Sequence, residues 1–117
     1  EEHEKEDKVQ EIVMSRPQPC TKYRDAERIA WIAKLIEETD EVIQEAYTIS
    51  QIEQTNKKTP CEAMNEVMQE ARKRLAMELT DVKTLCESLL YADGWDEEQR
   101  GDLQRIVNEK NKERGYL

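Results

Sequence analysis

Hydrophobic residues recur along this chain at the three- and four-residue spacing of amphipathic helices, and four segments follow that pattern. The first predicted helix covers residues 2–15, with a short apolar stripe of Val9, Ile12 and Val13. The sequence RPQPC ends it, because two prolines two residues apart cannot continue a helix. The second predicted helix covers residues 25–52. No internal repeat or low-complexity tract separates these segments, and the pattern predicts an all-α helical bundle.

Loop and capping signals set the limits of the other two helices. The polar stretch QTNKKTP predicts a loop, after which Thr59 caps a third helix with Pro60 at its first position. This third helix covers residues 60–92 and ends at the sequence ADG. Asp96 and Gln99 have the spacing of a capping box, so a fourth helix is predicted to start there and run to residue 113.

The second helix is apolar over more than half of its circumference. One strip of this arc consists of Ile29, Ile32, Ala33, Ile36, Ile43 and Tyr47, and the adjoining strip of Trp31, Leu35, Val42, Ala46 and Ile49. A helix with such a wide arc needs more than one neighbour, which predicts a central place in the bundle. The remaining strip carries Lys34, Glu38, Glu41 and Glu45.

The sequence KLIEETDEVI within this helix concentrates acidic residues. Glu38 and Glu41 are three residues apart and therefore point the same way. Such a pair is weak evidence alone, because 27 of the 117 residues are Asp or Glu. The plain alternative is a solvated acidic face on which Lys34 and Glu38 form an ordinary ion pair.

The third helix carries an acid on its apolar side. Glu78 falls near the middle of the apolar arc and Asp81 at its edge. A bare carboxylate facing a core costs several kcal/mol unless it is protonated, paired or bound to a cation. If this pair faces Glu38 and Glu41, four carboxylates share one pocket, and their oxygens suit Mg²⁺ or Mn²⁺. The alternative is that a basic residue, Arg72, Lys73 or above all Arg74, pairs with Glu78.

The apolar stripe of the fourth helix becomes cationic toward its end. Leu103, Ile106 and Val107 are followed one turn later by Lys110 and Arg114, and Asn108 and Asn111 flank the stripe. Such a face can close a bundle and reach an anion beside a metal. The alternative is that the two cations only complement the helix dipole.

Composition narrows the functional classes. A chain of 117 residues, with three Gly and three Pro, predicts a single helical domain over residues 1–117. The net charge of −9 disfavours nucleic acid or an anionic membrane as partner, and no apolar run is long enough to span a bilayer. Three cysteines without a CxxC pair favour a reducing, cytoplasmic environment over a disulfide framework or a zinc site.

KLIEETDEV followed by ELTDV resembles the EExxE…ExxD signature of the all-α nucleoside triphosphate pyrophosphohydrolases, the MazG-like superfamily. The superfamily includes dimeric dUTPases, dCTP pyrophosphatases and phosphoribosyl-ATP pyrophosphohydrolase. The ending NEKNKERGYL is also similar to the tails of small MazG-like proteins, so the resemblance covers about residues 26–117. It implies a four-helix-bundle-like fold and Mg²⁺- or Mn²⁺-dependent hydrolysis of an NTP or dNTP to the monophosphate and pyrophosphate.

The resemblance also assigns roles to residues. It implies metal binding by Glu38, Glu41, Glu78 and Asp81, a water-orienting base at Glu37 or Glu38, phosphate contacts from Lys34, Lys110 and Arg114, and sugar or base recognition by Asn108 or Asn111. Trp31 is a candidate for stacking on the base, although core packing is its plainer role. Together with the broad apolar arcs, the family's habit predicts a homodimer or a dimer of dimers.

Three other hypotheses remain open at this stage. The chain hydrolyses phosphoribosyl-ATP, or it is a non-catalytic helical module that keeps the fold, or it is an unrelated acidic bundle in which Glu78 has a basic partner. The wide interval between Glu41 and Glu78, which contains SQIEQTNKKTP, leaves the base preference open.

Overall fold

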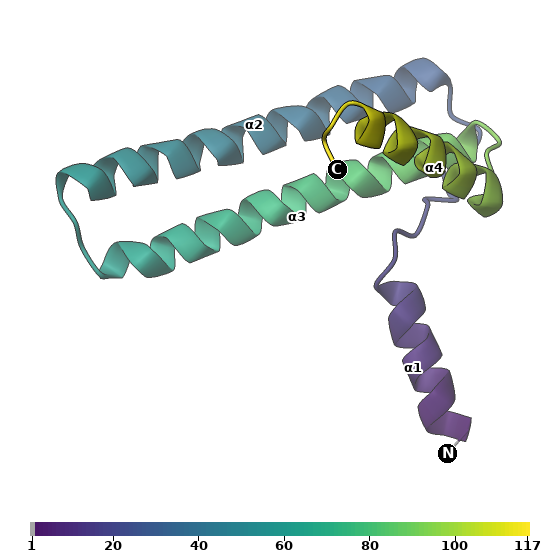
Figure 1. The fold of residues 1–117 in the computed structure, drawn as a ribbon, viewed down its shortest axis with the longest axis horizontal. Helices are drawn as coiled ribbons and strands as arrows, with labels where there is room; N and C mark the ends of the chain where they lie inside the picture. Colours follow the sequence, from purple (N-terminus) through teal and green to yellow (C-terminus); the bar gives the residue numbers. More distant parts are fainter. Residues whose placement is uncertain (1) are drawn as a thin grey trace. The chain divides into compact units, whose positions relative to one another are not determined.

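A computed structural model describes residues 2–117, except for the side chains of Val9, Gln10, Ile12 and Val13. Over this part of the chain there are four helices and no strand (Figure 1): α1 (Glu2–Met14), α2 (Arg28–Lys58), α3 (Ala63–Ala92) and α4 (Glu97–Glu113). The all-α class is therefore confirmed. The stripe predicted for the first helix, Val9, Ile12 and Val13, lies outside the described side chains. None of the described helices is both long and apolar enough to cross a membrane.

The turn between α2 and α3 differs from the prediction. Most of the expected polar loop is helical, because α2 continues to Lys58, and α3 begins at Ala63 rather than at Pro60. Residues 28–58 contain no proline or glycine that would end α2 earlier. Pro60 ends the helix, because a proline disfavours helical geometry at the residue before it. The turn is held by the side chain of Asn56, whose Oδ1 accepts the backbone N–H of Cys61 at 3.2 Å.

Residues of the chain group into two compact units. One unit is Ile29–Cys86, called the hairpin unit below, and it consists of α2 and most of α3. The other, called the terminal unit, combines the chain up to Arg28 with Glu87–Leu117.

In the hairpin unit α2 and α3 run antiparallel, side by side (Figure 1). Its buried side chains among the described residues are Trp31 and Ala71. Leu35, Val42 and Ile49 repeat seven residues apart on the same side of α2 as Trp31 and are half-buried. This side of α2 therefore packs on α3, and the small side chain of Ala71 lets the helices approach closely.

The terminal unit is held by hydrogen bonds and by the guanidinium groups of Arg24 and Arg100, which lie over the ring of Tyr91. Ser88 is buried, and its hydroxyl oxygen accepts the backbone N–H of Cys20 at 2.9 Å. The guanidinium of Arg100 donates to Glu87 at 2.8 Å and to the carbonyl oxygen of Trp95 at 2.7 Å. These contacts fix the start of α4 against the end of α3.

The capping box predicted for the fourth helix is confirmed. The N–H of Gln99 donates to Asp96 Oδ1 at 2.8 Å, and the N–H of Asp96 donates to Gln99 Oε1 at 2.9 Å. The end of α3 at ADG is also confirmed, because Gly94 has a φ of 95° and Trp95 N–H donates to Leu90 O at 3.0 Å. This is the hydrogen-bond pattern of a Schellman motif.

Two glycines should respond in opposite ways to alanine. Gly94→Ala is expected to destabilise the protein by about 1–2 kcal/mol, because a side chain is strained at positive φ. Gly101→Ala is expected to stabilise it by about 0.5–1 kcal/mol, because Gly101 lies inside α4 and an added Cβ meets no atom within 4 Å. Urea unfolding followed by circular dichroism measures both. Equal changes in the free energy of unfolding would contradict the conclusion that Gly94 needs its positive φ while Gly101 only weakens a helix.

An acid-sensitive contact joins the start of α2 to the end of α3. The Arg28 guanidinium donates to Asp93 Oδ1, at 2.8 Å from Nε, and Trp95 Nε1 donates to Oδ2 at 3.2 Å. The hydrogen bond from Arg28, and then that from Trp95, lower the pKa of Asp93 below its ordinary value of 3.8. Because the folded pKa is the lower one, the stabilisation is complete above pH 3.8 and is lost as pH falls through the folded pKa.

Asp93→Asn is therefore expected to lower the free energy of unfolding at pH 7 and to have progressively less effect as the pH falls below 3.8. Urea titrations of both proteins from pH 7 to pH 2.5 measure the difference. Asp102→Asn is the control, because Asp102 forms only an exposed pair with Arg105 inside α4. A difference for Asp93→Asn that stays constant down to the lowest pH would rule out the carboxylate as its source.

Candidate metal centre

Three of the four predicted metal ligands converge in the hairpin unit. Glu38 and Glu41, one turn apart on α2, meet Glu78 of α3, and one carboxylate oxygen of each lies within 4.8 Å of the others. The antiparallel turn explains the register, because Glu41 lies 17 residues before the end of α2 and Glu78 lies 15 residues after the start of α3. Three carboxylates this close repel one another when they are ionised.

Glu78 has the most restricted environment of the three. It is half-buried, and its Oε2 is fully shielded from solvent with no hydrogen-bond partner among the described residues. The basic partner considered for it is engaged elsewhere, since Arg74 Nε lies 3.3 Å from Glu45 Oε2. Within residues 2–117, Glu78 forms no ion pair, so the alternative in which a basic residue neutralises it is not supported.

Lys34 borders the cluster. Its Nζ lies 3.3 Å from Glu38 Oε1 and 3.4 Å from Glu37 Oε1. The hydrogen bond with Glu38, followed by the charge of Glu37, raises the pKa of Lys34 above its ordinary value of 10.5 and keeps it cationic. The ordinary ion pair considered for Lys34 and Glu38 is thus present, and it leaves Glu41 and Glu78 without a cation of their own.

Other predicted site residues lie outside this cluster. Asp81 is exposed on α3 and is not among the converging carboxylates. Trp31 is 7% exposed, with an indole N–H that has no partner in the described part of the chain, so it is a packing residue of the hairpin unit. The predicted substrate contacts on α4 belong to the terminal unit. Asn108, Lys110 and Arg114 are exposed, and Asn111 is half-buried.

The pair of Glu45 and Arg74 is the feature of this region that the sequence pattern did not identify. Glu45 was placed on the acidic strip, and Arg74 was considered as a partner for Glu78. The sequence could not have found the pair, because the loop predicted between residues 52 and 60 lies several residues before the turn in the structure, and the pairing depends on where the turn lies. The pair links the two helices one turn away from the carboxylate cluster and so supports its register.

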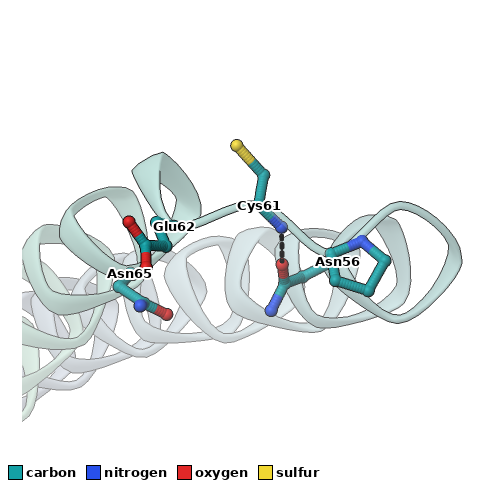
Figure 2. A pocket seen from close by; sticks show the side chains of 5 residues that line it. Asn56, Cys61, Glu62 and Asn65 are labelled. Atoms are coloured by element: carbon teal, nitrogen blue, oxygen red, sulfur yellow. Dashed lines mark hydrogen bonds between the residues drawn. The ribbon is translucent and has the colours of Figure 1, made fainter.

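Two clefts are lined by other residues than the clustered carboxylates. Figure 2 shows one of about 300 Å³ at the turn, lined by Asn56, Pro60, Cys61, Glu62 and Asn65, with the Cys61 thiol pointing away from Asn56. The other, of about 460 Å³, lies in the terminal unit between residues 16–19 and the first half of α4. Arg100 lines it but already donates to Glu87 and Trp95. Neither cleft contains a predicted catalytic or metal-binding residue, and all three cysteines are free thiols.

Comparisons with known proteins returned nothing: no family model, no curated protein and no solved structure matches this chain. The resemblance to the MazG-like pyrophosphohydrolases stays a prediction from the motifs.

Proposed function

We propose that this protein is a Mg²⁺-dependent nucleoside triphosphate pyrophosphohydrolase that works as a homodimer. The observation that carries the proposal is the meeting of Glu38, Glu41 and Glu78, on two helices, at the positions that the sequence motif designates. The shielded and unpartnered Oε2 of Glu78 adds to it, because a buried carboxylate oxygen without a hydrogen-bond donor is stabilised by a cation.

The donor set fits the proposed metal. Carboxylate oxygens are the ligands that Mg²⁺ and Mn²⁺ prefer, and Mg²⁺ sites commonly combine a few carboxylates with water and substrate phosphates. Glu38, Glu41 and Glu78 would hold the ion, and Asp81, one turn from Glu78 on α3, would complete the set through a second ion or a bridging water. Bound there, the ion would neutralise triphosphate charge and make a coordinated water more acidic.

The chain's own residues then account for the proton and the leaving group. Glu37 or Glu38 accepts a proton from the attacking water, whose oxygen forms a bond to the α-phosphorus. The bond between that phosphorus and the oxygen bridging to the β-phosphate breaks in line, so a monophosphate and pyrophosphate are released. The cationic ammonium group of Lys34 pairs with Glu37 and Glu38. When substrate binds, it would leave one of these carboxylates and pair with a phosphate oxygen instead.

Substrate recognition is proposed to involve α4. Lys110 and Arg114 supply cations for the phosphates, and Asn108 and Asn111 supply amide groups for the sugar or base. Lys110 and Arg114 are exposed, so both remain available to a ligand. The burial of Trp31 supports its packing role over stacking on a base.

The homodimer is proposed because α2 is covered on one side only in the hairpin unit. A second side, about 120° around the helix, carries five large hydrophobic residues that are 40–70% exposed. A helix that is apolar on two sides is normally buried on both.

The test is pyrophosphate release from a panel of NTPs and dNTPs, with phosphoribosyl-ATP included, in the presence of Mg²⁺, Mn²⁺ or EDTA. Release that requires metal supports the proposed reaction and identifies the base preference. Release from phosphoribosyl-ATP alone would assign the chain to that reaction instead. If calorimetry detects no binding of Mg²⁺ or Mn²⁺ and no substrate is hydrolysed, the proposal fails and a non-catalytic helical module takes its place.

A further inference from the structure

One side of α2 bears a continuous apolar stripe that no part of the hairpin unit covers. Its large members are Ile29, Ile32, Ile36, Ile43 and Tyr47, each 40–70% exposed. Trp31, Leu35, Val42 and Ile49, which face α3, lie about 120° around the helix from this stripe at 100° per residue. The stripe is therefore a second contact surface on α2.

The spacing of the stripe is that of a heptad seam. Ile29, Ile36 and Ile43 repeat every seven residues, and Ala33, Asp40 and Tyr47 form a second row four residues after each. Alternating steps of three and four residues are the pattern by which one helix packs along another of the same kind. The positions flanking this seam, Ala30, Ile32, Glu37, Thr39, Gln44 and Ala46, include a single charge.

A low content of charged residues distinguishes this surface from the rest of the chain. Of its twelve positions only Glu37 and Asp40 are charged, whereas 38% of the whole chain is Asp, Glu, Lys or Arg. Depletion of charged residues is the compositional sign of an interface core. The five large side chains present roughly 300 Å² of apolar surface. A standard interface covers about 800 Å² per partner, of which about 57% is apolar, so the stripe supplies more than half of that apolar area.

The apolar side of α3 is turned toward α2, with Ala71 buried and Leu75 and Val82 half-buried, and the sequences of α1 and α4 contain only shorter apolar stripes. From Ile29 to Tyr47 the stripe extends about 27 Å along the helix. The apolar residues of α4, Leu103, Ile106 and Val107, span only about 6 Å. The first seven residues of α1 are all charged residues or histidine. A second copy of α2 is the partner whose length and composition match.

We infer that this chain dimerises through the stripe of α2, with the two α2 helices antiparallel about a two-fold axis close to residue 38. This names the surface of the homodimer in the proposed function and rests on that part of it. In this arrangement Ile29 packs beside Tyr47 of the partner subunit, and Ile43 beside Ala33 of the partner subunit. Each isoleucine thus meets a residue of the other row, which is the layering of an antiparallel pair.

Asp40 sets the direction of the pairing. In a parallel pair in register, the two Asp40 carboxylates would face each other at the centre of the seam, and like charges in that position repel strongly. In the antiparallel pair each Asp40 lies beside Ile36 of the partner subunit, so the carboxylates are separated along the seam. One charge in the seam therefore selects an orientation, as polar core residues do in other helix pairs.

The first test is the mass of the full chain in solution by light scattering across a concentration series. The expected result is twice the 13.8 kDa chain mass for the wild type and an at least 100-fold weaker dimer for Ile36→Asp. Met77→Asp is the matched control, because Met77 on α3 is 59% exposed and Ile36 is 60% exposed, yet Met77 lies outside the stripe. The control is expected to change the dissociation constant less than threefold, with circular dichroism confirming equal helix content.

The second test fixes the orientation of the two helices. Ile29→Cys and Tyr47→Cys proteins are mixed and oxidised, and peptide mass spectrometry identifies which cysteines have joined. A disulfide needs Cα atoms 4.4–6.8 Å apart, so residues about 27 Å apart on one helix can join only between chains. The antiparallel pair predicts a disulfide between positions 29 and 47, and a parallel pair predicts 29 with 29 and 47 with 47.

Each outcome decides the inference. A monomeric wild type would overturn both the surface and the homodimer, and would indicate that other parts of the same chain cover the stripe. A dimer that survives Ile36→Asp, and that yields no disulfide between positions 29 and 47, would overturn the surface alone. Pyrophosphate release is measured on the same samples, so loss of the proposed reaction is seen separately from loss of the dimer.

Discussion

Glu78→Gln is expected to reduce metal-dependent pyrophosphate release at least 100-fold. The amide keeps the shape of the side chain but replaces one carboxylate oxygen with an N–H₂ group, which repels a cation. Even loss of a residue that only supports a metal ligand costs roughly 10–100-fold in affinity or activity, and Glu78 is proposed as a ligand itself. Because the cluster contains three carboxylates within 4.8 Å, removal of one charge should leave the folded protein as stable as before, or more so, without metal.

The control for this experiment is Glu53→Gln. Glu53 is an exposed acid on the same helix as Glu38 and Glu41 and lies outside the carboxylate cluster. It is expected to leave pyrophosphate release and Mn²⁺ binding by calorimetry within twofold of wild type. Glu41→Gln should behave as Glu78→Gln does. If either variant retains full metal binding and full activity, the cluster is not the metal site.

Trp31→Ala is expected to lower the free energy of unfolding by about 3–5 kcal/mol, because it removes a large buried side chain from a hairpin with little other core. This is a large fraction of the roughly 5–15 kcal/mol that stabilises a typical domain. Urea unfolding followed by circular dichroism at 222 nm measures the change. The helices should melt together in the variant at a lower denaturant concentration.

Two further tryptophan variants separate packing from other effects. Trp31→Phe keeps most of the apolar volume and removes an indole N–H that has no partner, so it should cost less than half as much as Trp31→Ala. Trp95→Ala is the control at the surface, where Trp95 is 38% exposed. A change below 1 kcal/mol for Trp31→Ala, together with weaker nucleotide binding, would restore the base-stacking role for Trp31.

Short-range signals predicted helix ends correctly where the responsible groups are close together along the chain. The Asp96 and Gln99 capping box and the glycine at the end of α3 act within five residues, so local geometry decides them. The start of α3 was misplaced because a threonine followed by a proline also fits a turn. Which of the two forms depends on how far α2 continues, and that is a cooperative property of the whole helix.

The carboxylate cluster was also predicted only in part from the sequence. The spacing of Glu38 and Glu41 placed both on one side of α2, and the apolar arc of α3 singled out Glu78. Only the paired helices show that these three converge while Asp81 stays exposed, and that Arg74 joins Glu45 rather than Glu78. The position of a side chain relative to another helix depends on the register and crossing of the two helices, which periodicity within one helix does not contain.

By itself, therefore, the sequence determined the helical class, the N-terminal cap of α4 and the faces of α2, because these follow from groups within one or two helical turns of each other. The tertiary structure decided that one apolar side of α2 meets α3 while the other stays exposed, and that Glu78 has no basic partner among the described residues. These facts are set by which surfaces pack together, and packing joins residues that are distant along the chain.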